Sequence, residues 1–154
     1  MGNLKLTSSA FSDGGEIPRE YGYKNGNYEP PLTISGKPEE TKSLALIMDD
    51  PDAMGAVGKV WVHWVVWNIV PEDDDFSHDL IMPLDIATNE GMTDFGEVGY
   101  GGPAPPDKRH TYVFKLYALD IELDLPLKST KADVEKAMEG HIIDQTQLTG
   151  TYAP

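Results

Sequence analysis

The apolar residues of this chain fall into three runs that have the length and spacing of β-strands. Residues 43–48 form a short apolar segment bounded by polar residues, which is typical of a buried strand. Residues 60–70 are apolar at nearly every position, which favours a central strand covered on both faces. A third run, residues 111–119, has one continuously apolar face. The 12 Pro and 15 Gly residues that interrupt the chain favour an all-β domain with many turns.

Alternation along two of these strands predicts which side chains share a face. In the second run, His63 is expected on the same face as Val65 and Trp67. His110 directly precedes the third run and extends the face that carries Tyr112. We expect this face of the third strand to point into the core.

One helix is predicted near the C-terminus. Thr130 and Asp133 resemble a capping box, in which two residues close the first turn of a helix. Apolar positions then recur with helical spacing as far as Ile142, and His141 lies on that apolar face. Residues 72–97 begin with an acidic segment and show little periodicity, so we expect a long surface connection there.

Size and composition indicate a single globular domain covering residues 1–154. No apolar run approaches the roughly 20 residues needed to span a bilayer. Residues 1–11 lack the basic start and the continuous apolar stretch of a signal peptide. Cysteine is absent, which excludes disulfides and thiolate metal sites. We therefore expect a cytoplasmic monomer or homodimer without membrane insertion.

The chain is strongly acidic, with 26 Asp and Glu residues against 12 Lys and Arg and a formal net charge of −14. A field of this sign repels the phosphates of nucleic acids and the surfaces of anionic membranes. We therefore expect no nucleic-acid partner. A phosphate-bearing ligand would have to be captured by a local cluster of hydrogen-bond donors that works against the global field.

Two segments carry carboxylates and an imidazole that could form a site. Asp50 and Asp52 flank Pro51 where the first predicted strand ends, and proline stiffens such a turn. The alternative interpretation is a strand-ending turn capped by aspartate hydrogen bonds. His63 lies within a strongly apolar strand, where a lone histidine is more often a hydrogen-bonded core residue than a ligand-binding one.

Two further segments could complete such a site. Residues 101–106 read Gly-Gly-Pro-Ala-Pro-Pro, in which Gly102 would let the backbone approach a ligand and Pro103 would stiffen the loop. A proline-rich turn without a ligand explains this segment equally well. His110 and Tyr112 lie two residues apart on one strand face, where the alternative is a buried, mutually paired His and Tyr.

Taken together, these motifs resemble the phosphatidylethanolamine-binding protein family, also called the Raf kinase inhibitor-like family, in its bacterial and archaeal branch. The likeness covers almost the whole chain, and its separated motifs appear in the family's order. The motifs are residues 4–11, 43–53 with Asp-Asp-Pro-Asp-Ala, 62–69 with Val-His-Trp, 94–96, 99–103, 110–114, 140–142 and 150–152.

The resemblance implies a mainly β fold, an antiparallel β-sandwich with Greek-key connections and one or two short helices. It also implies a small cavity near one end of the sandwich that accepts phosphate-like or acetate-like anions. Carried over motif by motif, the walls of this cavity would be Asp50, Asp52, His63, Gly102, Pro103, His110 and Tyr112. Two positions depart from the family's pattern. Met54 stands where the Asp-Pro-Asp-Ala-Pro turn has its second proline, and Thr111 replaces the arginine of a His-Arg-Tyr motif.

The expected function is non-catalytic binding of a small anion, phosphate or a phospholipid head group, with a kinase or protease as the protein partner that the resemblance implies. His63 and His110 would donate hydrogen bonds to the anion, and Asp50 would orient one imidazole and favour its protonated form. The alternative is a metal-dependent or acid–base hydrolase of a small phosphoester or ester, since the two aspartates and two histidines carry suitable groups. Neither a cysteine nor a Gly-x-Ser-x-Gly motif supplies a nucleophile, and the histidine spacing is not that of a metal site. We therefore predict no catalytic residue, no metal and no cofactor.

Overall fold

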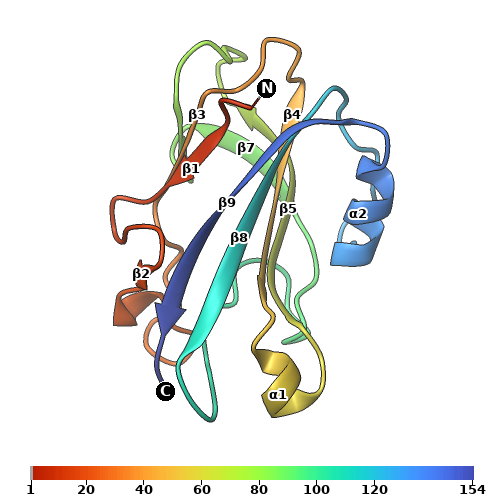
Figure 1. The fold of residues 1–154 in the computed structure, drawn as a ribbon. Helices are drawn as coiled ribbons and strands as arrows, with labels where there is room; N and C mark the ends of the chain where they lie inside the picture. Colours follow the sequence, from red (N-terminus) through yellow and green to blue (C-terminus); the bar gives the residue numbers. More distant parts are fainter. Residues whose placement is uncertain (1) are drawn as a thin grey trace.

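The computed structural model describes residues 2–154, which form two β-sheets packed face to face (Figure 1). The larger sheet has the order β2 (Gly15–Glu16), β9 (Ile142–Tyr152), β8 (His110–Leu119), β4 (Ser43–Asp50), β5 (Trp61–Pro71) and β7 (Ile86–Glu90). The smaller sheet has the order β1 (Lys5–Thr7), β3 (Leu32–Ser35) and β6 (Leu80–Met82). The helical segments are short: η1 (Arg19–Tyr21), α1 (Ala53–Val57) and α2 (Lys131–Met138). This architecture confirms the predicted mainly β sandwich, although the short pair β2–β9 is parallel.

The connections bring strands that are distant in sequence side by side. β4 lies between β5, the next strand along the chain, and β8, which comes only after the chain has formed β6 and β7. Asp49 pairs with Val113 of β8, and Asp50 pairs with Trp61 of β5. Because both neighbours run antiparallel to β4, the end of β4 meets the beginnings of β5 and β8 at one end of the sandwich.

The core lies on both sides of the larger sheet. All 8 residues of β4 are buried. Leu46 and Met48 pack between the two sheets, whereas Ala45 and Ile47 pack beneath α2. β5 contributes to the same two clusters, which confirms that its residues are covered on both faces.

β5 does not alternate regularly, and this corrects the predicted position of His63. Met48 of β4 pairs with Trp64, but the next residue, Asp49, pairs with Val62, so His63 is an extra residue in β5. Such a bulge places two successive side chains on one face. His63 therefore contacts Tyr112 on the face between the sheets and does not share a face with Val65 and Trp67, as strict alternation predicts.

β8 alternates as predicted. His110 and Tyr112 are buried on the face between the sheets. Thr111 and the next alternate residues, on the opposite face, are partly exposed. On the opposite face, Lys115 of β8 and Lys131 of α2 both bind the buried carboxylate of Asp49, at 3.1 and 2.8 Å. This pair of contacts joins α2 to the sheet.

The C-terminal helix begins as predicted but ends earlier. The Thr130 side chain accepts a hydrogen bond from the backbone of Asp133, whose carboxylate accepts one from the backbone of Thr130, so the capping box is confirmed. The helix ends at Met138, because Gly140 adopts a left-handed conformation with φ +80° and leads into β9. His141 therefore lies outside the helix.

The segment expected to be a long surface connection contains two strands. β6 joins the smaller sheet and β7 forms an edge of the larger one. In β6 only Leu80 and Met82 are buried, on either side of an exposed Ile81. A strand of three residues is too short to produce a recognisable period, which is why its pattern is missed. Among residues 2–154, none of the helices has the length and apolarity to span a bilayer.

Candidate functional site

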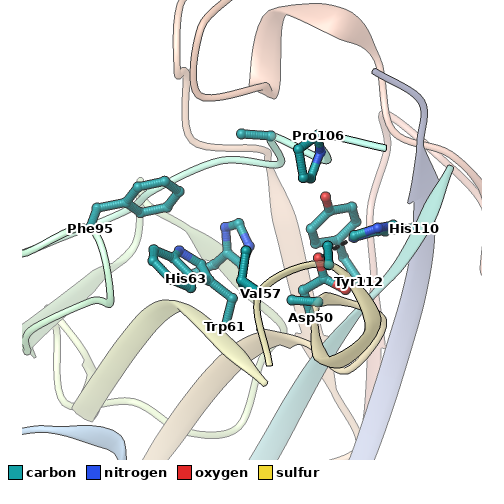
Figure 2. Close-up of a pocket in the computed structure, with 11 residues that line it drawn as sticks. Asp50, Val57, Trp61, His63, Phe95, Pro106, His110 and Tyr112 are labelled. Carbon is teal, nitrogen blue, oxygen red and sulfur yellow. Dashed lines mark hydrogen bonds and ion pairs between the residues drawn. The ribbon is translucent and has the colours of Figure 1, made fainter. Parts of the chain in front are cut away.

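A pocket of about 140 Å³ opens at the end of the sandwich where β4 ends and β5 and β8 begin (Figure 2). α1 and the loop that precedes β8 complete its walls. Its lining is mostly apolar, with a few polar groups. The lining residues are Asp50, Ala53, Ala56, Val57, Trp61, His63, Phe95, Ala104, Pro106, His110 and Tyr112.

The imidazole of His110 is held between two carboxylates. Its Nδ1 lies 2.6 Å from Oδ2 of Asp50, and its Nε2 lies 2.7 Å from Oδ1 of Asp107. The His110 side chain is fully buried, and that of Asp50 is only 4% exposed. Burial opposes the charged imidazolium, but the hydrogen bonds to Asp50 and Asp107 outweigh it and raise the pKa of His110. The structure therefore favours a protonated His110 whose N–H groups are both already used.

His63 is the opposite case. Its ring is buried, and Nδ1 lies 2.7 Å from the backbone oxygen of Gly101, which requires Nδ1 to carry a proton. Nδ1 is the nitrogen of this ring that is hydrogen bonded within residues 2–154. Burial lowers the pKa of His63, against the smaller opposing effects of the Gly101 carbonyl and of Asp50. The neutral ring therefore offers Nε2 as an acceptor, and a protonated ring would offer it as a donor.

The hydroxyl of Tyr112 is a buried polar group without a partner. The residue has no exposed surface, and no other group of residues 2–154 hydrogen bonds to its hydroxyl oxygen. The ring lies edge-on to His63, with 5.1 Å between the ring centroids, and its hydroxyl points towards Pro106 (Figure 2). Burial, and secondarily Asp50, raises the pKa of Tyr112 well above its ordinary value. The hydroxyl therefore remains a protonated donor at any physiological pH.

Of the residues expected at the site, the structure brings Asp50, His63, His110 and Tyr112 together on the pocket lining. Asp52, Gly102 and Pro103 do not line it. Asp52 is exposed, and its carboxylate accepts the backbone N–H of Thr111 at 2.8 Å. It ties α1 to β8 through the backbone of Thr111, so the contact does not depend on the Thr111 side chain.

Gly102 and Pro103 bind the loop before β8 to residues 23–27. The N–H of Gly102 donates to Oδ1 of Asn27 at 2.7 Å, so it is not available to a ligand. The carbonyl of Pro103 accepts the N–H of Tyr23 at 2.9 Å. The loop is thus bound to the segment that follows η1, and its close approach there requires the glycine.

Sequence reasoning missed the apolar walls and one carboxylate. Trp61, Phe95 and Pro106 line the pocket and were not expected there. Each lies within or next to one of the candidate segments, residues 62–69, 94–96 and 101–106. Nothing in the sequence signals Val57, which lies in α1 together with the exposed Met54 that departs from the family pattern. Asp107 also escaped notice, and only its position three residues before His110 could have indicated it.

The pocket does not present a set of metal ligands. Among residues 2–154, the group whose ligand atoms converge within 4.8 Å is Asp73, Asp75 and His78, which is exposed in the loop after β5. The carboxylates and imidazoles of the pocket do not converge in this way. Asp50 and His110 bind each other instead.

Comparisons with known proteins agree with this fold. Residues 7–153 match the profile of the family described as phosphatidylethanolamine-binding protein. A UPF0098 protein of Methanothermobacter thermautotrophicus is 44% identical over 151 residues, which cover 97% of this chain and 98% of that protein. The crystal structure of a phosphatidylethanolamine-binding protein homologue from Chlamydia trachomatis, CT736, has a TM-score of 0.86 and 39% identity, covering 99% of this chain and 98% of its own. Escherichia coli YbcL has a TM-score of 0.83 and 31% identity, covering 98% of each chain. This chain belongs to the phosphatidylethanolamine-binding protein family.

Proposed function

We propose that this chain is a non-catalytic binding protein whose pocket holds the anionic head of a small ligand such as a phosphomonoester. The observation that carries the proposal is the Tyr112 hydroxyl, which is fully buried and unpaired within residues 2–154. A buried hydroxyl without a partner is costly, and a ligand oxygen would satisfy it. Beside it, protonation of His63 would supply a cationic donor, and charge-assisted hydrogen bonds of this kind are the stronger ones.

The size and the walls of the pocket limit the ligand. A cavity of about 140 Å³ is close to the roughly 150 Å³ cavity that holds one benzene molecule. It would accommodate a phosphate with a few attached carbon atoms, and not two acyl chains. A phospholipid would therefore be recognised only through its head group. The exposed side chains of Val57, on the pocket lining, and of Met54, in the same helix, provide an apolar surface for a protein partner, in our proposal a kinase or a protease.

The hydrolase alternative has less support from the geometry. The buried pair of Asp50 and His110 could serve as an acid–base group, but the pocket lining contains no serine, threonine or cysteine to act as a nucleophile. Phosphatase and esterase assays, with and without divalent metal, separate the two functions. Turnover that a His63→Ala substitution abolishes would show that the pocket is catalytic and would contradict the proposal.

Replacing Tyr112 by phenylalanine is expected to separate binding from stability. The substitution removes the donor, so the affinity for inorganic phosphate should fall about tenfold. It also removes an unpaired buried hydroxyl, so the free energy of unfolding should stay constant or rise by about 1 kcal/mol. Titration calorimetry and urea denaturation measure the two effects. Tyr117→Phe is the matched control, because Tyr117 packs in the cluster beneath α2 on the other face of the sheet. Unchanged phosphate affinity in the Tyr112 variant would argue against the proposed function.

Anion affinity is expected to decrease as pH rises. Because burial lowers the pKa of His63 below its ordinary value, protonated His63 becomes populated only at acidic pH, where Nε2 turns into a donor. His110, whose pKa is raised, loses its charge at a higher pH than His63 does, so a loss of affinity at acidic pH reports on His63. Sulfate is the suitable probe since its own charge stays constant. Calorimetric titrations from acidic to neutral pH should show the loss, and His63→Asn should flatten the profile. An equally steep profile in that variant would exclude His63 as the titrating group.

A further inference from the structure

We propose that Asp107 is an internal competitor for the anion site: its carboxylate occupies the His110 Nε2 position that a bound anion would use, so a ligand must displace it. This inference rests on the proposed function and adds a residue that determines which ligands the pocket accepts. It concerns a side chain outside the pocket lining.

The two carboxylates on His110 differ in how firmly they are held. The Asp50 side chain is 4% exposed, lies at the end of β4, and accepts a second hydrogen bond from the backbone of Asp52. The Asp107 side chain is 43% exposed and lies in the loop before β8. Displacing a carboxylate from its partner costs less free energy when water can solvate the carboxylate afterwards. Asp50 is therefore the permanent partner of the imidazole, and Asp107 is the one that can swing out into solvent.

The local charge also indicates that Asp107 must move before an anion can bind. One imidazolium between Asp50 and Asp107 carries a local net charge of −1, within a chain whose net charge is −14. In this closed arrangement an approaching anion meets a negative site, and the His110 ring has no free donor. When Asp107 moves away, the remaining Asp50–His110 pair is neutral and Nε2 becomes available as a charged donor.

His110 and Tyr112 are neighbours on the pocket lining. His110 and Tyr112 lie two residues apart on one face of β8, with 6.4 Å between their ring centroids, and both line the pocket. A tetrahedral oxyanion has enough oxygen atoms to accept from Nε2 of His110 and from the Tyr112 hydroxyl together. Asp107 satisfies only the first of these donors, which leaves the Tyr112 hydroxyl unpaired as observed.

The test is the affinity of inorganic phosphate for the Asp107→Ala variant, measured by titration calorimetry at low ionic strength and mildly acidic pH. Removing the competitor is expected to strengthen binding about tenfold relative to the unchanged chain. Asp107→Asn, which keeps an acceptor oxygen without its charge, should give an intermediate gain. Asp124→Ala is the matched control. It removes one exposed carboxylate beyond the opposite end of β8 and should leave the affinity unchanged.

The outcomes separate this inference from the proposed function. Tighter binding in the Asp107 variants alone supports the inference, because loss of a purely structural contact would weaken binding. Equal or weaker binding, in variants of a chain that itself binds phosphate, overturns the role of Asp107 and leaves the proposed function in place. Absence of phosphate binding in every variant overturns both.

Discussion

Replacing Asp50 by asparagine is expected to lower the free energy of unfolding by about 3 kcal/mol at neutral pH. Asp50 and His110 form an ion pair of 2.6 Å in which the His110 side chain is fully buried. Removing one partner of such a pair leaves an incompletely compensated buried charge, whereas the remaining contact with Asp107 keeps the loss at the lower end of the usual range. Urea denaturation followed by tryptophan fluorescence measures the change.

The pH dependence of this variant provides a second measure. The raised pKa of His110 in the folded chain means that its charge stabilises the fold fully below the ordinary histidine pKa. This contribution is lost as pH rises through the raised value. The stability difference between the unchanged chain and Asp50→Asn should therefore narrow at alkaline pH. Asp52→Asn, an exposed change in the same turn, should cost less than about 1 kcal/mol. Equal losses for the two variants would show that the buried pair is not what stabilises this end of the sandwich.

Replacing Gly102 by alanine is expected to cost about 3 kcal/mol. A Cβ atom at this position would overlap with the backbone oxygen of Tyr21 and lie 2.9 Å from the backbone nitrogen of Tyr23. Both obstacles are backbone atoms, so no side-chain rotation relieves the clash. The loop of Gly102, which contributes Ala104 and Pro106 to the pocket wall, would have to move away from the backbone at residues 21–23. Phosphate affinity should therefore fall together with stability.

Gly55→Ala is the control for this substitution. No atom lies within 4 Å of a Cβ added at Gly55, which belongs to α1. Because alanine favours helical backbone by roughly 0.5–1 kcal/mol over glycine, this variant should be as stable as the unchanged chain or slightly more stable. Thermal denaturation of the two variants side by side checks the difference. A Gly102→Ala chain as stable as Gly55→Ala would mean that the loop is not held against the segment after η1.

The elements that the sequence predicts correctly are those with a long local signal. β4 is buried as predicted, β8 has the predicted face, and the capping box at Thr130 marks the first turn of α2. Errors occur where the local signal is short or is overridden by a neighbour. β6 has three residues and shows no period, and α2 ends before Ile142 because Gly140 turns the backbone into β9.

For the candidate site, the motifs predicted which residue types would be present but not all of their positions. Asp50, His110 and Tyr112 reach the pocket because strand alternation and antiparallel pairing bring them there. Gly102, expected to face a ligand, instead packs against the segment after η1, since its hydrogen bond to Asn27 depends on a contact between distant parts of the chain. No pattern local to Gly102 contains that information.

By itself the sequence determined the β-rich domain, its family and most of the polar groups at one end of the sandwich, because these follow from short-range periodicity and from motif order. Only the tertiary structure decided how those groups are used. The bulge in β5 turns His63 towards Tyr112, and the fold presents a carboxylate to each nitrogen of His110. Hydrogen-bond partners and burial depend on which strands become neighbours, and this long-range packing sets the charge of each histidine and leaves the Tyr112 hydroxyl without a partner among residues 2–154.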